Sequence, residues 1–229
     1  MIQSFKAVFF DAGGTLFHPY PSVGEIYAQV GAKYGCPGQA AQLEKLFREA
    51  WLRRDFSSLA SRSNEKIERD WWRELVREIF SAAGGVDDFE NFFDELYHCF
   101  GEAGAWRVYP GAPEVLEELK RRGKKIAVIS NWDSRLFKLC EGLGMKSHFE
   151  FILASAVFGA SKPSPRIFEE ALRKAGIKAH EAVHIGDSVE DDVKGALGIG
   201  MKAILIDRSS EPRKHHNVPT IRSLIELLR

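Results

Sequence analysis

Residues 6–15 read KAVFFDAGGT, a short apolar run that stops at an aspartate followed closely by two glycines. Four more short β-rich runs follow in the second half of the chain, at 126–130, 151–155, 182–186 and 202–207. Their apolar stretches are nearly continuous, as expected for strands buried on both faces of a parallel sheet. Residues 6–10 are therefore predicted to form one more strand of that sheet.

Amphipathic stretches separate these runs and carry start and stop signals for helices. Pro113 precedes the stretch 114–122, which Gly123 ends, and a Ser-Pro pair precedes the stretch 166–175, which ends at a glycine. Strand and helix alternate in this way in doubly wound α/β proteins. The sequence therefore predicts a Rossmann-like core of three layers built on a parallel sheet.

Residues 18–105 have a different character. They hold 10 Lys and Arg against 15 Asp and Glu, together with 14 of the 26 aromatic residues. No strand is expected there, because the apolar residues recur at helical spacing. We predict an all-helical domain at 18–105, inserted into a core domain made of 1–17 and 106–229. The neighbouring pairs Trp71-Trp72 and Phe92-Phe93 are interpreted as packing residues of that helical domain rather than as substrate contacts.

Composition limits the class of protein. Of 229 residues, 45% are apolar and 28% charged, which is typical of a soluble globular chain. The zero net charge argues against binding to nucleic acid through bulk positive charge. Three cysteines without CxxC spacing suit a reducing compartment, and the first apolar run is too short for a signal peptide or a membrane span. We expect a cytoplasmic protein that binds neither nucleic acid nor membrane; its oligomeric state is left open.

Polar residues stand where the predicted strands end. Asp11 follows the first strand, Ser130 and Asn131 the second, and a lysine comes after the third; the fourth ends in a carboxylate cluster that begins at Asp187. Ligands of open parallel sheets bind beyond these carboxyl ends. Paired carboxylates suit a hard cation such as Mg²⁺, and Lys162 with a hydroxyl suits an anion beside it. A phosphoryl group would fit both halves of such a site.

In this arrangement the sequence resembles the haloacid dehalogenase superfamily of phosphotransferases and hydrolases. The four motifs of that family appear in order, as Asp11-Ala-Gly-Gly-Thr15, Ser130, Lys162 and Gly186-Asp187 with Asp192. Residues 18–105 stand where the family inserts a helical cap, so the resemblance covers the whole chain. Residues 129–136, ISNWDSRL, also resemble a branch named after a rhythmically expressed gene.

The resemblance implies a magnesium-dependent phosphatase for a small phosphorylated molecule. Asp11 would be the nucleophile that forms an aspartyl-phosphate, and Thr15 would steady its loop. Ser130, Asn131 and Lys162 would bind the phosphoryl group, with the lysine also neutralising charge in the transition state. The expected metal shell consists of Asp11, the Gly13 carbonyl, Asp187 and Asp192, with Asp191 as the alternative to Asp192.

One position departs from the family pattern. Family phosphatases carry a second aspartate, the general acid and base, two residues after the nucleophile, and this chain has Gly13 there. Because such assistance contributes about 10²–10⁴-fold, poor leaving groups should be cleaved slowly. His18 or Tyr20, in the adjacent loop, is a less favoured substitute; a solvent-facing or cap-contacting position is expected for them.

Two other functions remain open. A 2-haloacid dehalogenase needs no proton for its leaving halide, but Asp187 would then place an unneutralised carboxylate beside Asp11. Such an enzyme needs a cation for the substrate carboxylate, and Arg48 is a candidate with nothing to single it out. The second alternative is a catalytically weak phosphate-binding module. His215-His216 is interpreted as a solvated loop, and the substrate itself cannot be named from the sequence.

Overall fold

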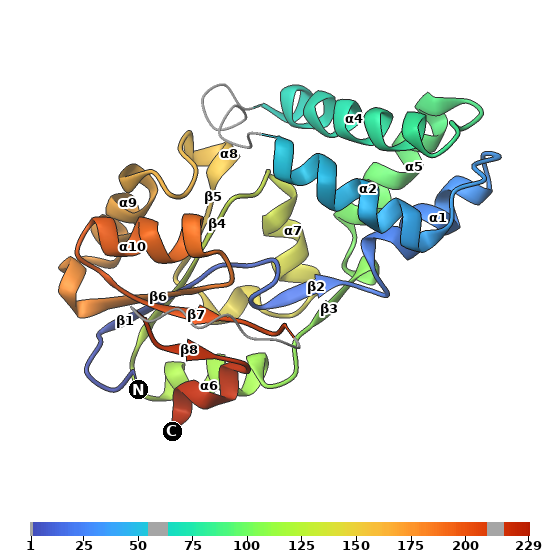
Figure 1. Ribbon diagram of the computed structural model, residues 1–229. Helices are drawn as coiled ribbons and strands as arrows, with labels where there is room; N and C mark the ends of the chain where they lie inside the picture. The colour runs from blue at the N-terminus through green and yellow to red at the C-terminus, as the bar shows by residue number, and fades with distance from the viewer. Residues whose placement is uncertain (1, 55–63, 210–217) are drawn as a thin grey trace.

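A six-stranded parallel sheet forms the centre of the molecule (Figure 1). The computed structural model describes residues 2–54, 64–209 and 218–229. The strand order is β5-β4-β1-β6-β7-β8, and the strands span Ala7–Phe10 (β1), Lys125–Ser130 (β4), Phe151–Ala154 (β5), Ala182–Gly186 (β6), Lys202–Ile206 (β7) and Thr220–Ile221 (β8). The predicted α/β class is confirmed, and β1 lies at the centre of the sheet between β4 and β6.

Helices cover both faces of the sheet (Figure 1). Val8 and Phe10 of β1 belong to one apolar cluster and Ala7 and Phe9 to the other, and all four side chains are fully buried. The first cluster includes side chains of α6 (Ala112–Arg121) and α7 (Arg135–Gly142); the second includes side chains of α9 (Pro165–Ala175) and α10 (Gly195–Gly198). Burial on both sides explains why these strands show no alternation of polar residues.

Shorter helical pieces complete this part of the chain. They are α8 (Ser155–Phe158), 3-10 turns at Ala103–Ala105, Lys146–His148, Ala179–Glu181 and Leu224–Leu228, and a π-helical turn at Val189–Lys194. The π-helical turn directly follows β6 and carries the carboxylate cluster singled out in the sequence.

Four helices form a separate layer beside the sheet, which we call the helical insertion (Figure 1). They are α1 (Val23–Ala32), α2 (Ala40–Arg53), α4 (Glu65–Ala82) and α5 (Phe89–Gly101). Side-chain caps begin three of them: Ser22 accepts a hydrogen bond from the Glu25 amide, Asn64 from Ile67, and Asp88 from Asn91. Their apolar faces share one cluster of buried side chains, as the helical spacing predicts.

A two-stranded antiparallel ribbon joins the insertion to the sheet domain. Its strands are β2 (Phe17–Pro19) and β3 (Trp106–Val108), with His18 opposite Arg107. The expectation of no strand within 18–105 is therefore wrong at its edge. Three residues that include a proline are too short to show strand periodicity, so only the pairing with β3 reveals this strand. The boundary between core and helical domain stays a prediction.

Buried polar contacts connect α4 of the insertion with the residues just before α7. The Trp72 indole nitrogen donates to Asp133 Oδ2 at 2.6 Å. Across the same interface, Glu68 Oε2 accepts hydrogen bonds from the Ser134 amide at 3.1 Å and its hydroxyl at 2.5 Å. Glu68 and Asp133 are at most 1% exposed, so these carboxylates depend on partners from the other layer. We call these contacts the α4–α7 junction.

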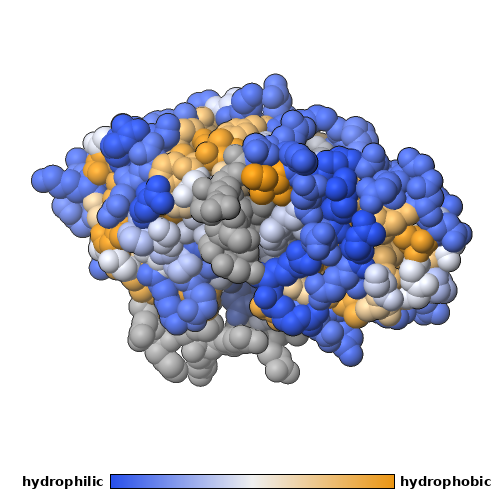
Figure 2. Space-filling view, turned by 90° about the horizontal axis from the view of Figure 1, so that it is seen from above, coloured by the Kyte–Doolittle hydropathy of each residue, from blue (hydrophilic) through white to orange (hydrophobic). Residues whose placement is uncertain are grey.

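The face seen in Figure 2 is mostly hydrophilic, with separate hydrophobic patches. Cys36, Cys99 and Cys140 form no disulfide, in keeping with the spacing of the cysteines. None of the helices within the described residues is long and apolar enough to cross a membrane. His215 and His216 lie outside the described residues, so the loop expected there is not tested.

Candidate active site

The carboxyl ends of β1 and β4 place the predicted nucleophile in contact with two of its predicted partners. Asp11 Oδ1 accepts hydrogen bonds from Lys162 Nζ at 2.6 Å and from Ser130 Oγ at 2.9 Å. All three residues are at most 6% exposed. No described residue donates a hydrogen bond to the other oxygen, Asp11 Oδ2, which therefore keeps its lone pairs for a ligand or for attack.

Asn131 fixes the loop that carries the lysine. Its Oδ1 accepts from the Lys162 amide at 2.7 Å, and its Nδ2 donates to the Lys162 carbonyl at 3.0 Å. Two antiparallel hydrogen bonds to one residue leave the Asn131 amide little capacity for another partner. Its geometry is that of a group that positions Lys162, although it was predicted to bind substrate.

Asp192 lies on the far side of the lysine. Its Oδ1 accepts from Lys162 Nζ at 2.6 Å and from the His184 ring at 2.8 Å, while Oδ2 accepts from the Ser188 amide at 3.0 Å. Asp191 turns instead to the Ser188 hydroxyl, at 3.3 Å. The structure thus places Asp192, of the two alternatives, in contact with the lysine. Because both of its oxygens are engaged, Asp192 acts on the site through Lys162.

Asp187 completes a group of three carboxylates. One oxygen each of Asp11, Asp187 and Asp192 lies within 4.8 Å of the others. Gly14 allows this approach: its φ is +80°, and a Cβ at that position would overlap Asp187 Oδ2. Oxygen ligands in this arrangement suit a hard cation such as Mg²⁺. Asp11 Oδ2, the Gly13 carbonyl and Asp187 are the groups available to hold it.

The charges of the site shift one another's proton affinities. Burial raises the pKa of Asp11, although the Lys162 ammonium opposes the rise. Burial together with the charges of Asp11 and Asp192 raises the pKa of Asp187 to about 7. For Asp192, burial acts in the same direction, but Lys162 and His184 outweigh it and hold the pKa below its usual range. A cation between Asp11 and Asp187 would relieve their repulsion.

Two further residues support the loop after the nucleophile. Thr15 is fully buried, and its hydroxyl has no hydrogen-bond partner among the described residues. Arg208, which the sequence reading missed, donates to the Gly14 carbonyl and, at 2.9 Å, to the Thr15 carbonyl. These bonds hold the loop in the conformation that brings Gly14 against Asp187.

His18 and Tyr20 do not reach the carboxylates. Neither is among the described residues that line the pocket around Asp11. His18 hydrogen-bonds the Pro19 carbonyl at 2.9 Å and packs on Tyr109, with the ring centroids 4.6 Å apart. The Tyr20 ring lies under the Arg107 guanidinium. The structure thus gives neither residue the contact a substitute proton donor needs.

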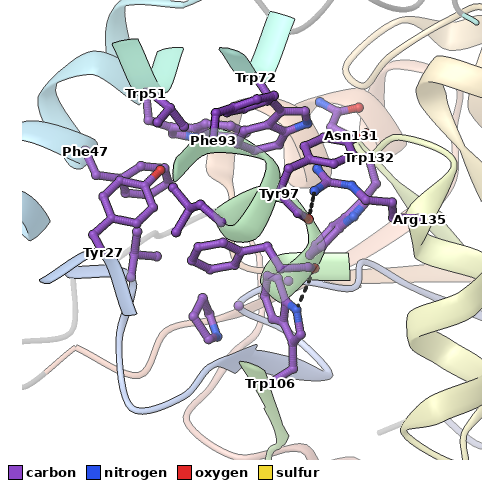
Figure 3. Close-up of a pocket in the computed structure, with 17 residues that line it drawn as sticks. Tyr27, Phe47, Trp51, Trp72, Phe93, Tyr97, Trp106, Asn131, Trp132 and Arg135 are labelled. Atoms are coloured by element: carbon purple, nitrogen blue, oxygen red, sulfur yellow. Dashed lines mark hydrogen bonds between the residues drawn. The ribbon is translucent and has the colours of Figure 1, made fainter. Parts of the chain in front are cut away.

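Two cavities meet at the site. The polar one, about 120 Å³, is lined by Asp11, Ser130, Lys162 and the three carboxylates after β6. The second, about 210 Å³, lies between the helical insertion and the sheet domain and has mainly aromatic walls (Figure 3). Gly13, Asn131 and Trp132 line both cavities. Trp72 and Phe93 line the aromatic one, so their interpretation as packing residues alone is incomplete.

Trp132 lies against the position where the family has its general acid. A Cβ on Gly13 would come within 2.7 Å of the Trp132 ring. The indole is held by Phe17 and Trp106, at centroid distances of 5.6 and 5.2 Å. A side chain at position 13 therefore requires Trp132 to move, a constraint that the sequence alone does not reveal.

Comparison with known proteins identifies similar chains. The model of a haloacid dehalogenase-like hydrolase family matches residues 5–200. The mouse haloacid dehalogenase-like hydrolase domain-containing protein 3 is 34% identical over 231 residues, covering 95% of this chain and 91% of the relative. The Drosophila melanogaster rhythmically expressed gene 2 protein is 28% identical, covering 91% and 85%, which confirms the branch suggested by residues 129–136. A phosphoserine phosphatase of Thermus thermophilus is 30% identical, covering 95% and 94%.

Solved structures have the same fold. A phosphatase from Thermococcus onnurineus superposes with a TM-score of 0.66 at 26% identity, covering 97% of this chain and 95% of that one. An L-2-haloacid dehalogenase gives a TM-score of 0.79 at 23% identity, covering 98% and 97%. Phosphatases and dehalogenases therefore both occur among the similar structures, and the chemistry has to be argued from the site.

Proposed function

The chain belongs to the haloacid dehalogenase-like hydrolase family, and from this premise we propose that it is a magnesium-dependent phosphatase. Its substrate would be a small phosphorylated molecule of the cytoplasm, cleaved through an aspartyl-phosphate on Asp11. The observation that carries the proposal is the state of Asp11. One oxygen is held by Lys162 and Ser130, and the other is free and faces the carboxylate of Asp187 across the polar pocket.

Asp11 would act as the nucleophile. The ammonium and hydroxyl on Oδ1 fix the carboxylate, so that Oδ2 can form the bond to phosphorus as the bond to the leaving group breaks. Lys162 remains beside the reacting centre and offsets the charge that develops on the phosphoryl oxygens. Bound Mg²⁺ would offset the repulsion between the anionic phosphate and the carboxylates. Asp192 and His184 hold the lysine in place from behind.

The three carboxylates also weigh against the dehalogenase alternative. Asp187 would stand ionised beside Asp11 in a metal-free dehalogenase, which like-charge repulsion disfavours. The candidate cation for a haloacid carboxylate, Arg48, is on the exposed side of α2, where it pairs with Glu44 at 3.1 Å. Neither observation favours a site for a 2-haloacid.

A panel of substrates separates these functions. The purified protein is assayed for phosphate release from 4-nitrophenyl phosphate and for chloride release from 2-chloropropionate, each with Mg²⁺ or with EDTA. We expect phosphate release that EDTA abolishes, and no chloride release. Chloride release that persists in EDTA would identify a dehalogenase, and the absence of both products would favour the binding module.

Asp187→Asn is expected to change how the melting temperature responds to metal and pH. Mg²⁺ should raise the melting temperature of the wild type, because it binds only the folded carboxylates, and the variant should lose that rise. Without metal, the native state retains the Asp187 proton up to about pH 7, whereas the unfolded chain releases it near pH 4. The wild type should therefore lose stability relative to the variant as the pH rises from 4 to 7. A melting curve at each pH, with and without Mg²⁺, measures both effects; an unchanged Mg²⁺ response in the variant would remove Asp187 from the metal site.

Restoring the missing acid is expected to require two substitutions. Gly13→Asp alone should lower the melting temperature without a gain in rate, since its Cβ meets the Trp132 ring. Combined with Trp132→Leu, the new carboxyl should raise turnover of an alkyl phosphate by up to about 10²-fold and that of 4-nitrophenyl phosphate much less. The comparison of kcat/KM for the two substrates across all four proteins measures this. An equal gain for both substrates would mean that the new carboxyl does not protonate the leaving group.

A further inference from the structure

The aromatic cavity has walls suited to a flat apolar group. Nine of its 17 lining residues are aromatic, and they come from both the insertion and the sheet domain (Figure 3). Phe47, Trp51 and Trp72 lie at one end of the cavity, and Trp106 and Trp132 at the other. Aromatic rings prefer tilted or offset contacts with other rings, which such walls can supply on several sides.

The cavity offers no free charge to a ligand. Among the described residues that line it, Arg135 carries the one charge, and its guanidinium is already paired. Arg135 Nη2 donates to Asp133 Oδ2 at 2.6 Å, and Nε donates to Asp133 Oδ1 at 3.0 Å. Its flat face covers the Tyr97 ring at 4.0 Å. A carboxylate or ammonium on the ligand would therefore be buried here without a partner, which is costly.

The size and position of the cavity connect it with the reaction. An apolar cavity of roughly 150 Å³ holds a benzene molecule, and this one measures about 210 Å³. It shares Gly13, Asn131 and Trp132 with the pocket around Asp11 and Lys162. A phosphate at the carboxylates therefore places the group it is bonded to at the mouth of the aromatic cavity.

We propose, resting on the phosphatase function above, that the substrate is the phosphate monoester of a phenol of one or two rings that carries no further charge. The Asp11 carboxylate forms the bond to phosphorus while the bond between phosphorus and the phenolic oxygen breaks, and the phenolate departs with that electron pair. It takes its proton from water. A second water then attacks phosphorus, releases inorganic phosphate and restores the carboxylate.

This leaving group agrees with the contact between Gly13 and Trp132. The indole stands where an acid would have to be placed, so the departing oxygen receives no proton from that position. Phenols ionise near pH 10, whereas aliphatic alcohols resemble water, near 16, so a phenolate leaves much more readily without an acid. The same tryptophan forms a wall of the cavity, and it both binds the ring and excludes substrates that need an acid.

The test compares substrates that separate ring binding from leaving-group chemistry. We would measure kcat/KM for 2-naphthyl phosphate, for acetyl phosphate, which has a good leaving group but no ring, and for phosphoserine. Transfer of a ring into an apolar site is equivalent to about 10- to 100-fold in binding, so 2-naphthyl phosphate should exceed acetyl phosphate by about that factor. Phosphoserine, with two extra charges and an alkyl oxygen, should be cleaved least.

Phe47→Leu and Phe89→Leu form a matched pair. Both phenylalanines are half-buried in the insertion, but only Phe47 lines the cavity among the residues that the structure describes. Phe47→Leu should raise KM for 2-naphthyl phosphate about 3- to 10-fold and leave acetyl phosphate unchanged, and Phe89→Leu should alter neither. Quenching of tryptophan fluorescence by 2-naphthol measures ring binding in the wild type, whether or not either variant folds.

The outcomes separate this proposal from the one on which it rests. Similar kcat/KM for 2-naphthyl and acetyl phosphate, both lost in Asp11→Asn, would overturn the aromatic substrate and keep the phosphatase. Phosphoserine as the best substrate would have the same consequence. Absence of phosphate release from all three compounds, with 2-naphthol still bound, would overturn the phosphatase and leave an apolar binding site.

Discussion

Asp11→Asn is expected to abolish phosphate release, by at least about 10⁴-fold in kcat, while the protein remains folded. An amide at this position keeps the shape of the carboxylate but cannot attack phosphorus. Lys162 would still have Asp192 as a buried partner at 2.6 Å, so the change leaves no unpaired charge. Release of 4-nitrophenol by the wild type and the variant, with a melting curve of each, is the measurement.

Two further observations make this result specific to the nucleophile. Beryllium fluoride with Mg²⁺, which mimics an aspartyl-phosphate, should raise the melting temperature of the wild type and not of Asp11→Asn. Asp70→Asn is the matched control, because Asp70 lies in α4 and pairs with Arg73 away from the carboxylates; it should retain full activity. Activity in Asp11→Asn above that of a mock purification would rule out the aspartyl-phosphate.

Lys162→Met is expected to lower both activity and stability. The ammonium contacts Asp11 and Asp192, each at 2.6 Å, and all three side chains are at least nine-tenths buried. Removing one partner of a buried ion pair costs about 3–5 kcal/mol of unfolding free energy, since the remaining carboxylates lose their countercharge. Loss of a charge that stabilises the transition state should lower kcat by about 10²–10³-fold. Urea unfolding and steady-state rates measure the two effects.

The pH dependence identifies the cause of the lost stability. Lys162 and His184 hold the pKa of Asp192 low in the wild type; without the lysine, burial raises it. Folded Lys162→Met should then take up a proton as the pH falls from 7 to 4, and its stability should approach that of the wild type. Adding Asp192→Asn should restore part of the stability at pH 7 in the same way.

A surface lysine provides the comparison for that variant. Lys146 pairs with Glu141 at 2.9 Å, but both side chains are more than half exposed. Lys146→Met should therefore cost no more than about 1 kcal/mol at any pH in this range. An equal loss in both lysine variants would show that the charge at the carboxylates is not what stabilises the fold there.

The sheet and the ends of its strands could be predicted because each rests on local sequence. Near-continuous apolar runs such as 182–186 are strands of the parallel sheet, and the polar residues directly after them lie at one edge. Once β1, β4 and β6 are neighbours, Asp11, Ser130 and Asp187 must come close together. This part of the site follows from topology, without knowledge of any side-chain conformation.

Contacts between distant residues could not be predicted in this way. Gly13 and Trp132 are adjacent only after folding, and nothing in either local sequence indicates that the indole occupies the space beside the glycine. Likewise, Trp72 and Phe93 have the spacing of core residues, and a side chain facing a cavity has the same apolar character as one facing a filled core. His184 did leave a signal: a histidine inside a buried strand needs a polar partner, which is Asp192.

The α4–α7 junction bears on the population of any state in which α4 separates from α7. Such a state would give up the hydrogen bonds from Trp72 to Asp133 and from Ser134 to Glu68. Hydrogen bonds to charged groups contribute about 1.5–3 kcal/mol each, so these two contacts alone would hold that state to roughly one molecule in 10²–10⁴. A ligand that enters only through it would have its apparent affinity lowered by the same fraction. Weakening the junction, by Glu68→Gln for instance, would then tighten apparent binding without changing a single residue that touches the ligand.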